Sequence, residues 1–392
     1  MLVYASFDAF PAPKGAATHL AAFAEALGRA RPPLQLVTVE AGPGAAAHAV
    51  DLGPGVVHVP LPAPGKDLIE RVLAFREGLR RFFAGRRADL VHVRSIYEGY
   101  PLARTKGRSC ARLLYEVNGL PSIELKYHYP LVAEDPELLR KLERQEAACL
   151  EAADLVVTPS AVTGELLLAR GLAPARLRVI PNGVDLARWR FQAPRRAPEA
   201  PLRLLYAGTL TSWQGVFVAL EALRLLRRDH PAELTLTGPA RKEQRRRLLD
   251  RAHELGVEEA LELRPPCPRD ELVALHHAHD VALAPLLPND RNLLQGCCPL
   301  KVIEAMAAGT PVVASDMPVV RALAQDGAEA LLVRPGSAKA LKDGLLRLLA
   351  EPALGPALAA RARARVEAEL TWERSCAALL AAYAELLGAP VA

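Results

Sequence analysis

Short apolar runs alternate with longer stretches of helical period along almost the whole chain of 392 residues. Continuous apolar runs such as 89–93 and 154–158 are typical of strands that are buried on both faces of a sheet. The first half therefore predicts parallel βαβ units. Its expected strands are 2–6, 34–39, 55–59, 89–93, 112–117, 154–158 and 177–180, and its expected helices are 16–30, 67–84, 134–150 and 160–170.

A stretch without periodicity, residues 186–201, contains three prolines and is expected to be a linker. The alternation of short apolar runs and helical stretches resumes after residue 201. The expected strands are 202–207, 233–237, 260–264, 279–284, 311–314 and 329–333. The expected helices are 213–228, 240–255, 269–277, 299–308, 318–325, 337–350 and 354–387, the last with a break near Thr371 and Trp372.

This pattern predicts an α/β protein with two Rossmann-like doubly wound domains that face each other across a cleft. The first domain is expected at 1–185 and the second at 202–370. A C-terminal helix, 371–392, is expected to pack back toward the first domain. Ligands of such sheets bind at the carboxyl ends of the strands, so we look for chemistry there.

Composition excludes several classes of protein. A net charge of +5 is too small for a dedicated nucleic-acid binder, and the six cysteines lack the paired spacing of a zinc site or a disulfide scaffold. No run of eighteen apolar residues and no signal-peptide pattern is visible, so a cytoplasmic location is expected. His276, His277 and His279 are expected to be helix-end residues rather than metal ligands, because neighbours on a helix point in different directions.

The segment 297–316 carries the clearest chemical pattern. Pro299 suits the first position of a helix and Gly309 suits the position just after its end, so a loop delivers backbone N–H groups at a helix N-terminus. Such a terminus is an anion site. Lys301 adds a cation in the first turn, where it opposes the helix dipole unless an anion lies nearby. Glu304, on the same helical face, can accept hydrogen bonds from the two hydroxyls of a ribose; a surface Lys–Glu pair is the plainer interpretation.

Residues 296–316 resemble the donor-binding segment of glycosyltransferase family 4, the retaining enzymes with the GT-B fold. Three further segments agree with that family in order and spacing, so the resemblance covers nearly the whole chain. They are Pro181-Asn-Gly-Val-Asp185, the strand and loop 204–216, and the glycine-containing loop Pro13-Lys-Gly-Ala-Ala-Thr-His19.

The resemblance implies a donor site and an acceptor-side loop. The implied donor-binding residues are Gly208, Thr209, Gln214, Gly238, Cys298, Pro299, Leu300, Lys301 and Glu304. The implied acceptor or phosphate loop contains Lys14 and Gly15. The co-substrate would be a nucleotide-diphosphate sugar, and neither a further cofactor nor a metal is expected.

Three positions depart from the family pattern. Gly296 stands where many members carry the first carboxylate of a Glu-x7-Glu pair, and Thr209 and Gln214 stand where an Arg and a Lys usually clamp the diphosphate. Asn118 stands where a His is common. We interpret these changes as a redistribution of charge to Lys301 and to Arg94, which follows the strand 89–93. Lys301, Asn118 and Arg94 are therefore the candidate catalytic residues.

The sequence thus predicts a glycosyltransferase that moves a sugar, with retention of configuration, to an envelope polysaccharide, a glycolipid or a small molecule. A noncatalytic nucleotide-sugar-binding relative and a nucleotide-sugar epimerase on the same fold are the alternatives. No motif names the sugar, the base or the acceptor. The basic amphipathic stretch 67–87 is expected to be a surface helix that packs on the sheet, and peripheral contact with the inner face of a membrane is its second interpretation.

Overall fold

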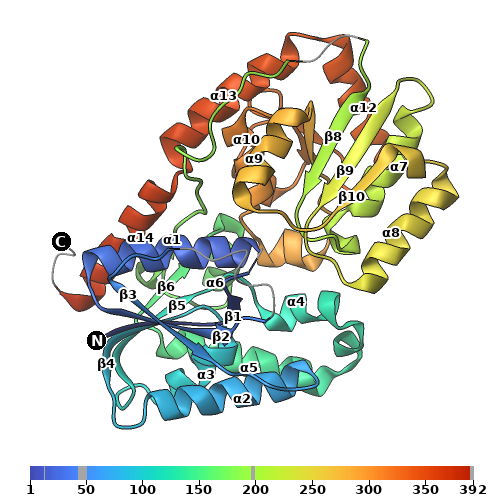
Figure 1. The fold of residues 1–392 in the computed structure, drawn as a ribbon. Helices are drawn as coiled ribbons and strands as arrows, with labels where there is room; N and C mark the ends of the chain where they lie inside the picture. Colours follow the sequence, from blue (N-terminus) through green and yellow to red (C-terminus); the bar gives the residue numbers. More distant parts are fainter. Residues whose placement is uncertain (13, 43–50, 196–198, 389–392) are drawn as a thin grey trace. The chain divides into compact units, whose positions relative to one another are not determined.

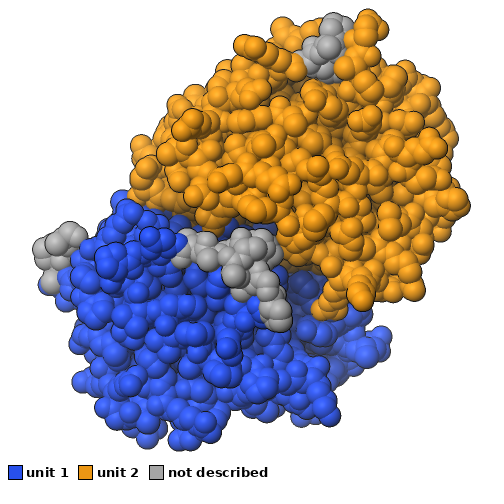
Figure 2. All heavy atoms as spheres, in the orientation of Figure 1, with its two compact units in different colours: residues 1–181, 294–297, 375–392 blue, residues 182–293, 298–374 orange. Residues whose placement is uncertain are grey.

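The computed structural model describes residues 1–12, 14–42, 51–195 and 199–388. The chain divides into two compact units, which Figure 2 shows in different colours. Unit 1 contains residues 1–181, 294–297 and 375–392, and unit 2 contains residues 182–293 and 298–374. Three parts of the sequence predictions lie outside the described residues: Pro13 of the glycine-containing loop, linker residues 196–198 and the terminal residues 389–392.

Unit 1 is built on a seven-stranded parallel sheet in the order β3-β2-β1-β4-β5-β6-β7. The central strands are mostly buried, β6 along its whole length and β4 at every position except Asp89, which explains why they appear in the sequence as nearly continuous apolar runs. The strands are β1 (Leu2–Phe10), β2 (Leu34–Glu40), β3 (Val56–Leu61), β4 (Ala88–Val93), β5 (Cys110–Glu116), β6 (Leu155–Thr158) and β7 (Leu177–Val179).

Helices cover both faces of this sheet (Figure 1). On one face, α2, α3 and α5 bury a cluster that includes Val3, Phe75, Leu113 and Cys149. On the other face, α14 lies beside α1, and the Cys376 thiol of α14 contacts the backbone carbonyl of Ala22 in α1. The helices are α1 (Gly15–Ala30), α2 (Leu68–Phe82), α3 (Ile96–Arg104), α4 (Pro121–His128), α5 (Pro136–Ala152), α6 (Ala161–Ala169) and α14 (Trp372–Leu387), with short turns η2 (Pro130–Glu134) and η3 (Pro174–Arg176).

Unit 2 has a six-stranded parallel sheet in the order β10-β9-β8-β11-β12-β13. The strands are β8 (Leu202–Ala207), β9 (Ala232–Thr237), β10 (Leu261–Arg264), β11 (Val281–Ala284), β12 (Val312–Ser315) and β13 (Leu331–Val333). The helices are α7 (Val216–Leu226), α8 (Lys242–Leu255), α9 (Arg269–Ala278), α10 (Leu300–Ala308), α11 (Pro318–Arg321), α12 (Ala338–Ala350) and α13 (Leu354–Glu369). Short turns are η4 (Ser212–Gln214), η5 (Glu258–Ala260) and the π-helical turn η6 (Arg291–Gln295).

Each sheet reverses its strand order beside its first strand. In unit 1 the reversal lies between β1 and β4, and in unit 2 it lies between β8 and β11. The connections diverge at such a point and leave a crevice at the carboxyl ends of the two strands, where ligands of doubly wound sheets bind. The predicted pair of parallel, doubly wound sheets is confirmed. In each unit we expect the site at the reversal of strand order, which is called the switch point below.

Several local predictions are confirmed and two helices were missed. Gly309 ends α10 in the left-handed conformation (φ 87°), and α13 and α14 are separated at residues 370–371. Pro299, expected as the first helical residue, is the cap that precedes α10. The helices α3 and α4 have 9 and 8 residues, and α3 contains Pro101, so neither presents a sustained helical period. Ser95 and Glu98 form a capping box at α3, and that sequence signal was available.

Among the described residues, no helix has both the length and the apolar surface needed to cross a bilayer. In α2 the side chains of Val72, Phe75, Leu79 and Phe82 are buried, which agrees with a helix that packs on the sheet. Ile69 and Leu73 remain exposed on the same helix. Glu77 pairs with both Arg80 and Arg81, so part of the basic face is neutralised within the helix. Contact of this helix with a membrane stays a prediction.

His276 gives unit 2 a testable acid sensitivity. Its ring is buried against Trp189, and neither ring nitrogen has a hydrogen-bond partner among the described residues. Burial lowers the pKa of His276 to about 3, so the folded protein keeps the ring neutral while the unfolded chain takes up a proton below about pH 6.5. The neutral His276 ring therefore makes its full contribution to the free energy of unfolding above pH 6.5. This contribution is lost as the pH falls toward 3.

We expect His276→Phe to reduce this loss by up to about 1.4 kcal/mol per pH unit below pH 6.5. The phenyl ring keeps the contact with Trp189 and cannot titrate. The measurement is the free energy of unfolding in urea at several pH values between 7.5 and 4.5. Parallel pH dependences of the variant and the natural protein would contradict the interpretation.

Candidate functional site

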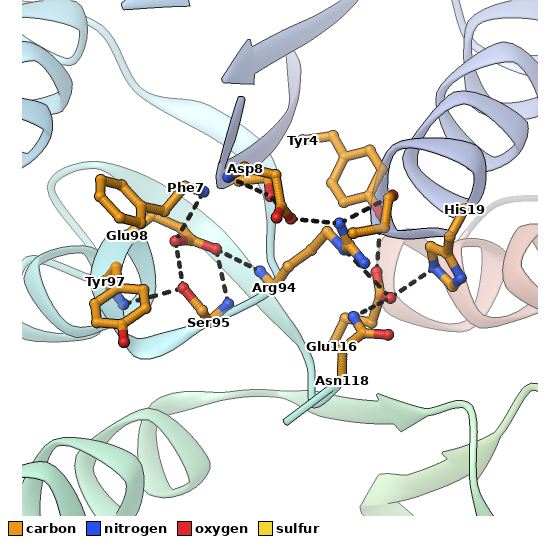
Figure 3. A network of polar contacts seen from close by, with 12 residues as sticks. Tyr4, Phe7, Asp8, His19, Arg94, Ser95, Tyr97, Glu98, Glu116 and Asn118 are labelled. Carbon is orange, nitrogen blue, oxygen red and sulfur yellow. Dashed lines mark hydrogen bonds and ion pairs between the residues drawn. The ribbon is translucent and has the colours of Figure 1, made fainter. Parts of the chain in front are cut away.

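Glu116, the last residue of β5, is the centre of a buried polar network in unit 1 (Figure 3). Its carboxylate accepts a hydrogen bond from the Tyr4 hydroxyl at 2.8 Å. His19 Nε2 lies 2.6 Å from one carboxylate oxygen, and His92 Nε2 lies 3.0 Å from the other. His92 also contacts the Tyr383 hydroxyl at 3.0 Å, which joins α14 to the network. All of these side chains are buried, so their polar atoms depend on one another.

The surroundings of Glu116 favour its ionised form. Burial raises the pKa of Glu116, but the nearby His19 and Arg94 outweigh burial and hold this pKa well below its usual range. Burial raises the pKa of Tyr4 and lowers the pKa of His92, so both of these groups stay neutral at physiological pH. The network therefore carries a fixed negative charge at Glu116.

Arg94 links the network to the switch point of unit 1. It follows β4, and its guanidinium lies 3.5 Å from Glu116 and 2.8 Å from the half-exposed carboxylate of Asp8 on β1. The ends of β1 and β4 are joined again by Glu98, which accepts backbone hydrogen bonds from Phe7 and Arg94 (Figure 3). Arg94 thus has two carboxylate partners, and its charge is largely compensated.

The other sequence-derived candidates of unit 1 lie near the start of α1 and the end of β5. The Asn118 amide donates to Glu116, so the structure brings Asn118 and Arg94 together on one carboxylate. Lys14 is the residue that caps α1, and Gly15 is the first residue of that helix. Both are exposed. Asp8, Glu98 and His92 were not singled out from the sequence.

Lys301, in the first turn of α10, lies at the switch point of unit 2. Its ammonium donates to the Tyr206 hydroxyl at 2.8 Å and to the Gln214 side-chain oxygen at 2.8 Å. It also lies 4.3 Å from the centre of the Tyr206 ring, within the range of a cation–π interaction. The structure therefore brings together Lys301 and Gln214, which were both predicted, with Tyr206, which was not.

Two glycines allow close approach at the end of β8. A Cβ atom on Gly208 would lie 3.2 Å from the end of the Lys301 side chain. A Cβ atom on Gly238 would lie 2.0 Å from the carbonyl oxygen of Gly208, so no side chain fits there. Both glycines have positive φ. Thr209 contributes its backbone carbonyl, which accepts from the Tyr206 hydroxyl at 2.9 Å.

Glu304 lies one turn along α10 from Lys301 and is half-buried. Burial raises the pKa of Glu304 to about 7, and the nearby charges of Arg269 and Lys301 oppose that rise. Arg269 begins α9, and burial lowers its pKa. At pH 7 the Glu304 carboxyl group is thus near the midpoint of its titration, and hydrogen bonds from ligand hydroxyl groups would favour its ionised form.

The loop before α10 is held by the Pro-Asn-Gly-Val-Asp segment. The Asn182 amide donates to the carbonyl of Cys298 at 2.8 Å, and Val184 pairs with Thr371. Cys298 is buried, while Pro299 and Leu300 are half-buried. The start of α10 is therefore fixed from the side of residue 182, a role for this motif that the sequence alone did not reveal.

The backbone conformation and the surroundings of Gly296 exclude a side chain, which accounts for its departure from the family pattern. It has φ 82°, and a Cβ atom there would lie 2.7 Å from the Ser160 hydroxyl and 2.8 Å from the Thr163 nitrogen, at the start of α6. A glutamate at this position would therefore be both strained and obstructed. The preceding Gln295 is fully buried, where it accepts from the backbone of Leu120 and donates to Glu124.

Two family profiles match this chain. A profile described as Glycosyltransferase Family 4 matches residues 13–188, and one described as Glycosyl transferases group 1 matches residues 187–365. The chain belongs to glycosyltransferase family 4. The two profiles meet within the expected linker and together span residues 13–365, so the resemblance inferred from the motifs is confirmed.

Relatives of this chain include a glycogen synthase of Mycobacterium tuberculosis, 32% identical over 247 residues. That match spans 63% of this chain but only 58% of the relative. A D-inositol 3-phosphate glycosyltransferase of Saccharomonospora viridis is 28% identical over 365 residues, which is 87% of this chain and 82% of the relative.

Solved structures agree on the GT-B fold. The sucrose-phosphate synthase of Thermosynechococcus elongatus superposes with a TM-score of 0.80 at 23% identity, over 99% of this chain and all of that one. The Anabaena protein HepE, solved in complex with UDP and glucose, gives a TM-score of 0.76 at 14% identity, over 98% of this chain and all of that one.

The Glu116 network predicts an asymmetry between the two carboxylates that face Arg94. Glu116→Gln leaves a fully buried guanidinium beside a neutral amide, which we expect to cost about 3–5 kcal/mol of unfolding free energy. Asp8→Asn is the matched control, because it removes the half-exposed partner, whose loss is expected to cost about 1 kcal/mol or less. Urea unfolding at pH 7 measures both. Equal losses would contradict the central position of Glu116.

Proposed function

We propose that this glycosyltransferase moves a sugar from a nucleotide-diphosphate sugar, with retention of configuration, to an envelope polysaccharide, a glycolipid or a small-molecule acceptor. The observation that carries the proposal is the geometry of α10: a helix N-terminus and the Lys301 ammonium at the switch point of unit 2, with Glu304 one turn further along. These groups match the diphosphate and the ribose of one ligand.

The diphosphate is the part of the donor that the helix start would bind. Backbone N–H groups at a helix N-terminus and a lysine ammonium both favour anionic oxygens. When the bond between the sugar and the diphosphate breaks, negative charge develops on the leaving phosphate and the sugar carbon becomes cationic. Fixed dipoles and a fixed cation stabilise that change without reorganisation, and this account needs no bound metal.

Glu304 is the proposed contact of the ribose. A carboxylate can accept from two neighbouring hydroxyls at once, and hydrogen bonds to a charged group are stronger than neutral ones. A bound ribose would also recover the hydrogen bonds that burial takes from the carboxylate. The Anabaena protein of the same fold that was solved with UDP and glucose supports a nucleotide sugar as the donor class.

The sugar half of the proposed donor site lacks the first carboxylate of the family pattern, because Gly296 stands at that position. Because Gly296 cannot be exchanged for a carboxylate without strain, the transferred sugar must be held by other groups than the family's usual first glutamate. The acceptor side is proposed at the switch point of unit 1, where Asp8 presents a carboxylate oriented by Arg94 and by the Ser6 hydroxyl. A neutral hydroxyl compound suits such a carboxylate, since a hydroxyl can donate to it.

The ribose contact gives a direct test of the proposal. Calorimetry with UDP, GDP and ADP identifies the nucleotide that binds most tightly, and the same titration is repeated with its 2′,3′-dideoxy form. We expect Glu304→Ala to weaken the ribonucleotide about tenfold to a hundredfold, which corresponds to about 1.5–3 kcal/mol for a hydrogen bond to a charged group. The dideoxy nucleotide should bind the natural protein and Glu304→Ala with similar affinity.

Glu243→Ala is the control, because this exposed glutamate lies on α8 and pairs only with Arg246 among the described ion pairs. Equal weakening of both nucleotides by Glu304→Ala would remove the ribose assignment. Slow release of nucleoside diphosphate from the matching nucleotide sugar supports catalysis. Tight binding of nucleotide sugars without any such release would favour the noncatalytic alternative.

A further inference from the structure

The Lys301 side chain is held more firmly than its place in the helix would suggest. A lysine is flexible, and a cation in the first turn opposes the helix dipole, so neither entropy nor electrostatics favours an ordered ammonium there. Contacts with Tyr206 and Gln214 nonetheless hold it. The ammonium lies 2.8 Å from the Tyr206 hydroxyl, 2.8 Å from the Gln214 side-chain oxygen and 4.3 Å from the centre of the Tyr206 ring. Two residues far away in the sequence therefore position this cation.

Tyr206 is arranged to accept from the ammonium. It is fully buried on β8, and its hydroxyl proton is directed to the carbonyl of Thr209 at 2.9 Å. With the proton committed to that bond, the oxygen lone pairs face Lys301. Burial raises the pKa of Tyr206, so the residue remains a neutral phenol and does not form an ion pair with the lysine. The contact orients the ammonium while leaving its positive charge in place.

Gln214 fixes the ammonium from a second direction. It closes the turn η4, where its backbone nitrogen donates to the carbonyl of Thr211 at 3.1 Å. Its side-chain amide is neutral, so it too orients the ammonium without cancelling the charge. The tip of Lys301 meanwhile lies against Gly208, just after β8. The cation is thus placed at the carboxyl end of the strand that borders the switch point.

We propose that Tyr206 and Gln214 are positioning residues that hold the Lys301 ammonium in advance of the donor, so that the site contains a preformed cation for the leaving diphosphate. This inference rests on the proposed function. A loosely held cation still attracts the bound nucleotide, because attraction depends mainly on the charge. A fixed cation also stabilises the charge that develops as the leaving group departs, since no reorganisation is needed at that moment.

The proposal predicts that positioning and charge have separable effects. Tyr206→Phe keeps the ring and removes only the hydroxyl, and Gln214→Ala removes the second oxygen. Each is expected to lower kcat for release of nucleoside diphosphate from the nucleotide sugar by about tenfold and to change nucleotide affinity by less than about threefold. Lys301→Met removes the charge itself and should reduce both quantities, each by at least about tenfold.

A swap variant tests whether the position of the cation matters more than the helix that carries it. Because Gln214 Oε1 lies 2.8 Å from the ammonium, a lysine at 214 can place its own ammonium in nearly the same region. The double variant Gln214→Lys/Lys301→Met should therefore recover at least about a third of the nucleotide affinity that Lys301→Met loses. Lys339→Met, on the exposed face of α12, is the matched control for loss of one positive charge.

The experiment measures thermal unfolding, nucleotide binding by calorimetry with UDP, GDP and ADP, and release of nucleoside diphosphate from the corresponding sugars. Unchanged kcat in Tyr206→Phe and Gln214→Ala would overturn the positioning role and leave the proposed function intact. An equal loss of affinity and kcat in those variants would also overturn it, because a general disturbance of the site predicts that result. Absence of any nucleotide binding by the natural protein would overturn the proposed function and this inference together.

Discussion

The reversal of strand order beside the first strand of each sheet is the constraint on which the candidate residues of each unit depend. Parallel strands deliver all of their carboxyl ends to one edge, and the strand order reverses at β1/β4 in unit 1 and at β8/β11 in unit 2. Ligands of doubly wound sheets bind at such a reversal. Asp8 and Arg94 come from the first of these places, and Gly208 and the tip of Lys301 lie at the second. The strand order of each sheet therefore determines where the candidate residues lie, and the loops contribute the remaining residues.

The two switch points treat their cations in opposite ways. In unit 1 the Arg94 guanidinium is buried between Glu116 and Asp8, and both of these partners are carboxylates. In unit 2 the Lys301 ammonium is oriented by a phenol and an amide, which are neutral. A cation that is buried between two carboxylates organises the protein itself, whereas the Lys301 ammonium, which is held by a phenol and an amide and lies near the Glu304 carboxyl group, keeps a positive charge at the end of β8. This difference is why we assign the anionic end of the donor to unit 2 and hydroxyl recognition to unit 1.

The sequence predicted the features that depend on local pattern. Continuous apolar runs identified the buried strands, and Gly309 and the break near Thr371 marked helix ends correctly. The role of Tyr206 could not be predicted, because a tyrosine within an apolar strand is indistinguishable from a core residue. Its contact with Lys301 spans 95 positions, and pairings of that kind are created only by the fold. Gly296 was recognised as a departure, but its cause, the crowding by Ser160 and Thr163, required coordinates.

The central claim is that a nucleoside diphosphate binds unit 2 where α10 begins beside the end of β8. Hydrogen–deuterium exchange with and without the tightest-binding of UDP, GDP and ADP tests it most directly, because bound phosphates protect the backbone N–H groups that they contact. The account predicts slower exchange in peptides that cover residues 206–216 and 298–305. Protection confined to unit 1, with unchanged exchange in those two segments, would contradict it.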